Sequence, residues 1–139
     1  MTSFRFRTIR QRVMVDASPS EVYEMYVDAK KHAEFTGSAA TGVARVGSSF
    51  SAWDGYISGK FLELKQGQRI VQEWRTTEWP EGYPSSVVEV SVERKGKKTQ
   101  LTIVHSSVPA EQADNYARGW TDYYWEPLKR HFSRASHST

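Results

Sequence analysis

Two adjoining patterns decide the fold, and both lie in residues 86–132, SVVEVSVERKGKKTQLTIVHSSVPAEQADNYARGWTDYYWEPLKRHF. In the first half, Val88, Val90 and Val92 alternate with polar residues, and a second alternating run follows at 99–106. A Lys-Gly-Lys-Lys turn separates the two runs. Alternation of this kind is typical of antiparallel strands that bury one face of their sheet.

The second half changes period and predicts one long amphipathic helix from Pro109 to about Phe132. Its apolar positions recur at steps of three and four, at Ala113, Tyr116, Ala117, Trp120, Tyr124, Leu128 and Phe132. Gly119 costs about 1 kcal/mol relative to Ala inside a helix, and Pro127 removes a backbone hydrogen bond. We therefore expect the helix to approach the sheet closely at Gly119 and to bend near Tyr123.

Upstream, the segment from Thr41 to Ser107 is rich in β-forming residues and punctuated by turns. Asp54-Gly55 stands between two β-forming runs and predicts a type I′ hairpin, whose central residues both need positive φ. Further strands are expected at Lys60 to Leu64, Ile70 to Thr77, Ser86 to Glu93 and Thr99 to Ser106. This segment therefore supplies about six antiparallel strands.

A first strand precedes them, since Ile9, Val13 and Val15 share one parity. Phe4 and Phe6 have the opposite parity, so the strand either starts late or contains a bulge.

Two short helices are expected after this strand. Ser18, Pro19 and Glu21 form the start of the first helix, with a capping box closed by Glu21. Asp28 can cap a second helix, which ends at Gly37.

The chain thus predicts an α+β helix-grip fold: a curved antiparallel sheet of six or seven strands around a long C-terminal helix. We expect a single domain over residues 1–139, with a core from about 9 to 132 and a frayed tail at 134–139.

Composition narrows the classes of partner. The net charge of +3 is mild and gathers at the two ends of the chain, whereas nucleic-acid binders usually show a continuous basic face. No apolar run approaches the ~18 residues that span a bilayer, and the first residues carry no apolar leader segment. The chain has no cysteine, which removes disulfides and thiolate chemistry. The expected location is the cytoplasm.

Several motifs together resemble the START-like (SRPBCC) superfamily. They are FSAWDGYISGKF (50–61), IVQEWR (70–75), WPEG (79–82), Val108-Pro109, Gly119-Trp120 and YYW (123–125). Within that superfamily they resemble the branch homologous to the C-terminal domain of the activator of the ninety-kilodalton heat-shock chaperone ATPase. The resemblance extends from about Ile9 to Phe132. It implies a sheet that grips the C-terminal helix with a cavity between them.

The aromatic residues expected to face this interior are Trp53, Phe61, Trp74, Trp79, Trp120 and Tyr124. They form either a cavity wall or a packed core, and the sequence leaves both open. His105 shares the parity of Leu101 and Ile103 and should also point inward, as a ligand contact, a proton shuttle or a satisfied core histidine.

No catalytic residue, cofactor or metal site is predicted. Glu63, Glu73 and Glu78 lie on or beside strands, but no nucleophile elbow, phosphate loop or histidine pair at metal-ligand spacing accompanies them. The loop from Trp79 to Ser85 is either a contact loop or a long hairpin connection.

The first hypothesis for function is binding of a small apolar, lipid-like ligand. The second is a chaperone-interacting domain that stimulates a heat-shock ATPase. The third is a cofactor-free enzyme acting on an aromatic or polyketide-like substrate. We predict no nucleic-acid partner and no membrane insertion, and the oligomeric state stays open.

Overall fold

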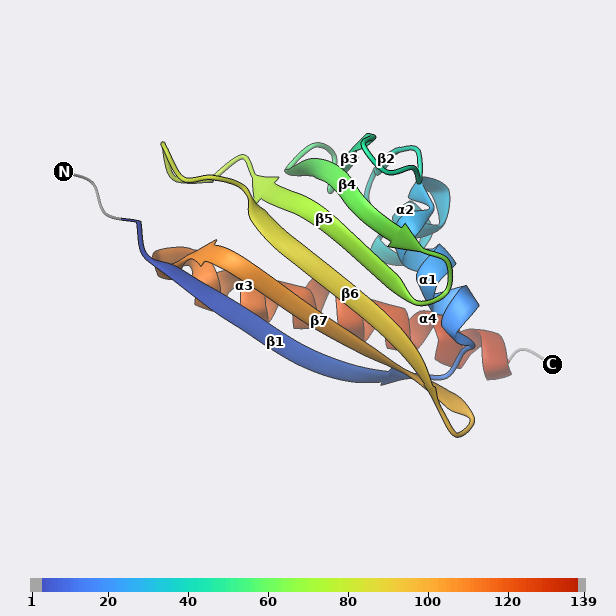
Figure 1. Ribbon diagram of the computed structural model, residues 1–139. Helices are drawn as coiled ribbons and strands as arrows, with labels where there is room; N and C mark the ends of the chain where they lie inside the picture. Colours follow the sequence, from blue (N-terminus) through green and yellow to red (C-terminus); the bar gives the residue numbers. More distant parts are fainter. Residues whose placement is uncertain (1–3, 138–139) are drawn as a thin grey trace.

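Over residues 4–137 the sheet is antiparallel throughout, and its seven strands follow the order β1-β7-β6-β5-β4-β3-β2 (Figure 1). This computed structural model describes the backbone of residues 4–137 and the side chains of 4–133. The strands are β1 Phe6–Val15, β2 Thr41–Gly42, β3 Ser49–Ala52, β4 Ile57–Lys65, β5 Arg69–Thr76, β6 Ser86–Lys95 and β7 Lys98–Pro109. The first strand pairs with the last, so the chain returns to its beginning before it enters the C-terminal helix.

The parity conflict in β1 is resolved by a bulge rather than by a late start. The register between β1 and β7 shifts between Arg7 and Ile9. Phe6 therefore belongs to the strand and stays exposed, whereas Ile9 turns into the core.

The β3–β4 hairpin contains the predicted type I′ turn. Asp54 and Gly55 have φ of 55° and 88°, and the N–H of Tyr56 donates to the carbonyl of Trp53 at 3.1 Å. Trp53 also has a positive φ of 54°, which the sequence did not predict. The backbone thus holds Trp53 in an uncommon conformation at the edge of the sheet.

Side-chain capping defines α1 (Pro19–Val27) and α2 (Ala29–Thr36). The capping box is complete, because Ser18 Oγ accepts from the Glu21 N–H and Glu21 Oε1 accepts from the Ser18 N–H. These bonds lower the pKa of Glu21. Asp28 caps α2, and Gly37 ends it in the left-handed conformation at φ 79°.

The C-terminal helix begins later than predicted, because Pro109 still pairs with Phe6 at the end of β7. A 3-10 turn, Ala110–Gln112, leads into α3 (Ala113–Trp120), a π-helical turn (Thr121–Trp125) and α4 (Glu126–His137). Where a bend is expected near Tyr123, the structure has this π turn, in which the Glu126 N–H bonds to the Thr121 carbonyl. It lies directly before Pro127, which has no N–H to give.

The expected close approach at Gly119 is wrong. A Cβ built there would meet one neighbour within 4 Å, the Tyr123 ring at 3.9 Å, and no part of the sheet. The sheet does require glycine at Gly59, where a Cβ would stand 1.8 Å from the Glu73 carbonyl oxygen of β5.

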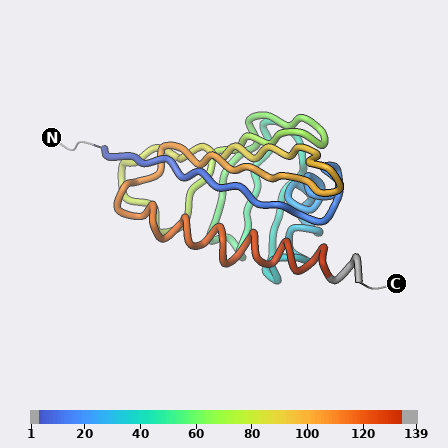
Figure 2. The backbone as a smooth tube through the Cα atoms, turned by 90° about the horizontal axis from the view of Figure 1, so that it is seen from below, coloured from blue at the N-terminus to red at the C-terminus, as the bar shows by residue number. Residues whose placement is uncertain are grey.

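The helix forms one layer along one face of the sheet (Figure 2). Side chains such as Val88, Leu101, Ile103 and Leu128 are almost fully buried between the layers. The α1–α2 pair lies at the end of the sheet where β1 finishes, and α2 contacts α4. The backbone of the expected tail is helical as far as His137, and the side chains of 134–139 lie outside the described residues.

Within residues 4–137, no helix combines the length and the apolar character needed to cross a membrane.

Candidate functional site

A pocket of about 390 Å³ opens between the sheet and the first half of the C-terminal helix. Its wall is largely aromatic and comprises Trp53, Tyr56, Trp74, Tyr116, Trp120, Tyr123 and Tyr124. The remaining lining residues are Ile57, Glu78, Gln112, Asn115 and Gly119. This size and lining are typical of small-molecule sites.

Three buried rings form the floor. Trp74 projects inward from β5, and its ring lies 5.7 Å from that of Trp120, centroid to centroid. Trp120 in turn lies 4.7 Å from Tyr124 at the helix. Trp53 borders the pocket beside these rings, and its ring centroid lies 6.1 Å from that of Tyr124. Because these rings brace one another, the floor is formed before any ligand arrives.

The mouth of the pocket lies at the helix. Gly119 contributes no side chain there, which leaves space that a larger residue would fill. Tyr123 stands beside this gap with 58% of its surface exposed, and its ring lies 5.5 Å from Trp53. The exposed lining residues Glu78, Asn115 and Tyr123 mark the side on which the pocket meets solvent.

One end of the pocket is polar. The Tyr56 hydroxyl donates to Glu78 Oε2 at 2.8 Å, and the Tyr116 hydroxyl donates to Gln112 Oε1 at 2.9 Å. Gln112 Nε2 donates to the Glu78 carbonyl at 2.8 Å, which joins the two pairs. Burial, together with the bond to Glu78, raises the pKa of Tyr56, so this hydroxyl stays a donor at neutral pH.

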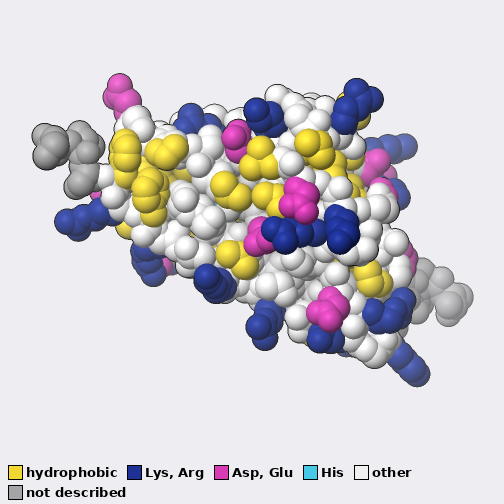
Figure 3. All heavy atoms as spheres, in the orientation of Figure 1, with side chains coloured by type: hydrophobic (Ala, Val, Ile, Leu, Met, Phe, Trp, Pro, Cys, Tyr) yellow, Lys and Arg dark blue, Asp and Glu magenta, His cyan; other side chains and the backbone are white. Residues whose placement is uncertain are grey.

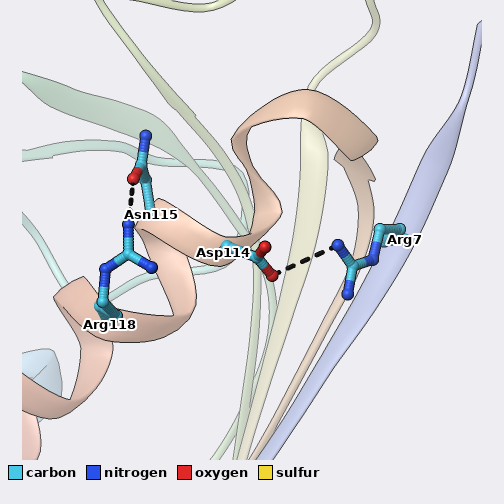
Figure 4. A network of polar contacts seen from close by, with 4 residues as sticks. All are labelled: Arg7, Asp114, Asn115 and Arg118. Carbon is cyan, nitrogen blue, oxygen red and sulfur yellow. Dashed lines mark hydrogen bonds and ion pairs between the residues drawn. The ribbon is translucent and has the colours of Figure 1, made fainter.

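Opposite sides of α3 have different roles (Figure 4). Asp114 faces β1 and forms an exposed ion pair with Arg7 at 3.3 Å. Asn115 points the other way, toward the pocket rim, where its Oδ1 accepts from Arg118 Nη2 at 2.5 Å. The first pair ties the helix to the sheet, and the second orients a rim residue.

Behind the floor, His105 lies fully buried in a chain of hydrogen bonds. Trp120 Nε1 donates to its Nδ1 at 3.0 Å, and its Nε2 lies 2.8 Å from Ser86 Oγ, which donates to the Trp74 carbonyl. The donor from Trp120 requires an unprotonated Nδ1, so Nε2 carries the proton. Burial lowers the pKa of His105 to about 3. The imidazole is thus neutral and satisfied.

The far half of the sheet–helix interior is filled. A space of only about 20 Å³ remains there, beside Tyr26, His32 and Gln72. His32 binds the Tyr26 carbonyl through Nδ1 at 2.8 Å, and its Nε2 lies 3.0 Å from the Tyr124 hydroxyl. The Tyr26 hydroxyl donates to Gln72 Oε1. These polar groups satisfy one another within the core.

Residues 16–133 match the family described as "Activator of Hsp90 ATPase homolog 1-like protein". This chain belongs to that family. It is 32% identical over 115 residues to the human activator of 90 kDa heat shock protein ATPase homolog 1, which covers 83% of this chain and 34% of the relative. It is 30% identical over 131 residues to the Dictyostelium discoideum homologue, covering 94% and 34%. The chain therefore spans about a third of the length of these curated relatives.

The fold of the family is also seen in the crystal structure of an HSP90 activator from Plasmodium falciparum. That structure superimposes with a TM-score of 0.84 at 24% identity and covers 91% of this chain and 96% of the other. The START-like resemblance and the helix-grip fold expected from the sequence are thus confirmed.

In this family member, the pocket brings together Trp53, Trp74, Trp120 and Tyr124 of the predicted set. Phe61 packs instead on Phe50 at 5.2 Å, beside the filled half. The other two predicted residues, Trp79 and His105, are absent from the described lining of the pocket.

Trp79 and His105 each pack behind a lining ring. Trp79 stacks on Tyr116 at 5.9 Å and donates through Nε1 to the Pro84 carbonyl. His105 contacts the ring of Trp74 at 4.7 Å from behind the floor.

Several residues that line the pocket are not predicted from the sequence. Tyr116 was placed on the apolar face of the helix, which is a signal that could have identified it. Tyr56 and Asn115 carry no periodic signal, because their position depends on a turn and on the start of a helix. Of the carboxylates considered earlier, Glu78 alone lines the pocket, and it is exposed. Among the described residues, no group of three or more His, Asp or Glu could hold a metal ion.

Proposed function

We propose that this chain binds a 90 kDa heat shock protein in the cytoplasm and stimulates its ATPase. The observation that carries the proposal is the family match over residues 16–133, together with 30–32% identity to relatives named as activators of that ATPase. The shared segment makes up about a third of those relatives, so the proposal assigns the chaperone contact to that part.

An exposed aromatic patch supplies a contact surface for this partner. Hydrophobic side chains gather at the end of the molecule where β1 begins and the β5–β6 connection turns (Figure 3). Phe4 and Phe6 are 44% and 42% exposed, and Tyr83 packs on both, with centroids at 4.7 and 5.7 Å. Exposed apolar clusters of this kind mark interaction sites.

Two hydrogen bonds hold the β5–β6 connection that carries Tyr83. Arg75 Nη2 donates to the Tyr83 carbonyl at 2.8 Å, and the Tyr83 hydroxyl accepts from the Arg5 N–H at 3.3 Å. The patch is therefore presented on a fixed backbone, which lowers the entropy cost of binding a partner.

The test is ATP hydrolysis by the purified chaperone of the same organism while this chain is titrated in. Hydrolysis should rise and saturate. The double variant Phe6→Ser, Tyr83→Ser should need a higher concentration for half-maximal stimulation. Val46→Ser, which changes an apolar residue between β2 and β3 that is more exposed than Phe6, is the control and should behave as the unmodified chain.

We propose as a second function that the pocket binds a small, largely apolar molecule. The observation that favours it is the 390 Å³ aromatic-lined space beside Gly119. An apolar fluorophore should bind saturably, quench tryptophan fluorescence and raise the melting temperature, because a ligand bound only by the native state stabilises it. Gly119→Leu should abolish this binding by filling the mouth, and Gly119→Ala should retain it.

A further inference from the structure

We propose that the pocket selects organic cations, with an ammonium group held between its aromatic wall and Glu78 and an apolar body on the floor. This inference rests on the second proposed function, that the pocket binds a small molecule. The inference specifies the charge of that molecule, which the apolar lining alone does not determine.

The aromatic wall provides the first reason. Seven of the twelve lining residues are Trp or Tyr, so most directions out of the pocket meet an aromatic ring. The rings of Trp53 and Tyr123 meet edge to face at 5.5 Å, and Trp74 and Trp120 lie 5.7 Å apart at 34°. The faces of Trp and Tyr attract ammonium groups, and they do so best when the cation is withdrawn from water.

Glu78 provides the second reason. Among the twelve described lining residues it is the one that carries a charge, and that charge is negative. The Tyr56 hydroxyl donates to Oε2 and fixes the carboxylate, while Oε1 forms no hydrogen bond or ion pair among the described residues. A cation therefore finds a positioned carboxylate oxygen, whereas an anion would meet like charge.

Three donor groups that an anion could use are already engaged. The hydroxyls of Tyr56 and Tyr116 donate to Glu78 and Gln112, and Gln112 Nε2 donates to the Glu78 carbonyl. The cation beside the rim, Arg118, is exposed and binds Asn115, so solvent weakens its repulsion of a bound ammonium.

The experiment compares three ligands that share a benzyl group and differ in charge: benzyltrimethylammonium, its uncharged isostere neopentylbenzene, and benzylsulfonate. Binding is measured by quenching of tryptophan fluorescence at low ionic strength. We expect the cation to bind about tenfold more tightly than the neutral compound, in line with a desolvated cation–π contact. Benzylsulfonate should bind most weakly.

Three variants test whether the preference for the cation arises from Glu78 and the pocket. Glu78→Gln keeps an acceptor for Tyr56 and removes the charge, so it should weaken the cation several-fold and leave neopentylbenzene unchanged. Glu81→Gln removes a charge from the exposed β5–β6 connection and should change neither affinity. Gly119→Leu should abolish binding of both.

Two outcomes overturn the proposal, and they differ in what they leave standing. If neopentylbenzene binds as tightly as the cation and Gly119→Leu blocks it, the pocket is a ligand site without a preference for cations. If none of the three ligands binds, the second proposed function fails as well. Neither outcome bears on stimulation of the chaperone ATPase.

Discussion

The indole Nε1 of Trp120 donates a 3.0 Å hydrogen bond to Nδ1 of His105 in the fully buried layer between helix and sheet. This bond joins the C-terminal helix to β7 and fixes the tautomer of the imidazole. Ser86 and the Trp74 carbonyl complete the chain from the other ring nitrogen. The pocket floor, which includes Trp74 and Trp120, therefore packs against a neutral histidine.

That arrangement predicts a loss of stability in mild acid. Burial lowers the pKa of folded His105 to about 3, against about 6.5 in the unfolded chain, so the unfolded state binds more protons below pH 6.5. Stability from this group is fully present above pH 6.5 and falls as the pH drops toward 3. His32, whose pKa is also lowered by burial, acts in the same direction.

Urea unfolding at pH 7 and pH 5 measures this effect. His105 alone should account for a loss of about 2 kcal/mol between the two values. The glutamine of His105→Gln can accept from Trp120 and donate to Ser86, but it does not titrate. The variant should therefore lose about 2 kcal/mol less free energy of unfolding between pH 7 and pH 5 than the unmodified chain. An equal loss in the variant would show that His105 is not the group responsible.

Truncation of Trp120 should be among the most damaging single changes. Its side chain is 2% exposed, stacks on Trp125 at 5.3 Å, and satisfies His105. Trp120→Ala should lower the free energy of unfolding by ~3–5 kcal/mol. A loss below ~1 kcal/mol in urea would mean that the ring contributes little to the core.

Gly119 should tolerate a methyl group and gain from it. A Cβ at this helical position meets only the Tyr123 ring, at 3.9 Å, and Ala has the higher helix propensity. Gly119→Ala should therefore raise the free energy of unfolding by about 0.5–1 kcal/mol. Destabilisation on the same scale would indicate that the helix needs glycine there for packing.

Loss of the floor should weaken ligand binding more than a change outside the pocket. Trp74→Ala removes a ring that lines the pocket, whereas Arg7→Ala removes only the exposed ion pair with Asp114. With an apolar fluorophore, the Trp74 variant should show an altered dissociation constant and the Arg7 variant an unchanged one. A similar effect of both substitutions would place the fluorophore elsewhere on the protein.

Local chemistry made much of the fold predictable. Ser18 with Glu21, and Asp54 with Gly55, act through bonds to near neighbours, so a sequence pattern identifies them. The alternation around Val90 likewise predicts which face of β6 is buried.

What could not be predicted depends on contacts between distant segments. The sequence pattern predicts a helix from Pro109, but pairing with Phe6 keeps this residue in β7. Phe61 is expected to face the interior as cavity wall or packed core, and strand pairing sets its place in the core beside Phe50. The difference between a filled core and an open pocket depends on the summed volume of many side chains, which no local pattern encodes.

The central claim is that this chain activates a 90 kDa heat shock protein, and one measurement tests it most directly. Steady-state ATP hydrolysis by the chaperone of the same organism is followed as the purified chain is added, with a specific chaperone inhibitor to subtract other ATPase activity. We predict a saturable rise that the Phe6→Ser, Tyr83→Ser variant shifts to higher concentration and Gly119→Leu leaves unchanged. An ATPase rate that stays flat at saturating concentrations of the folded chain would contradict the claim.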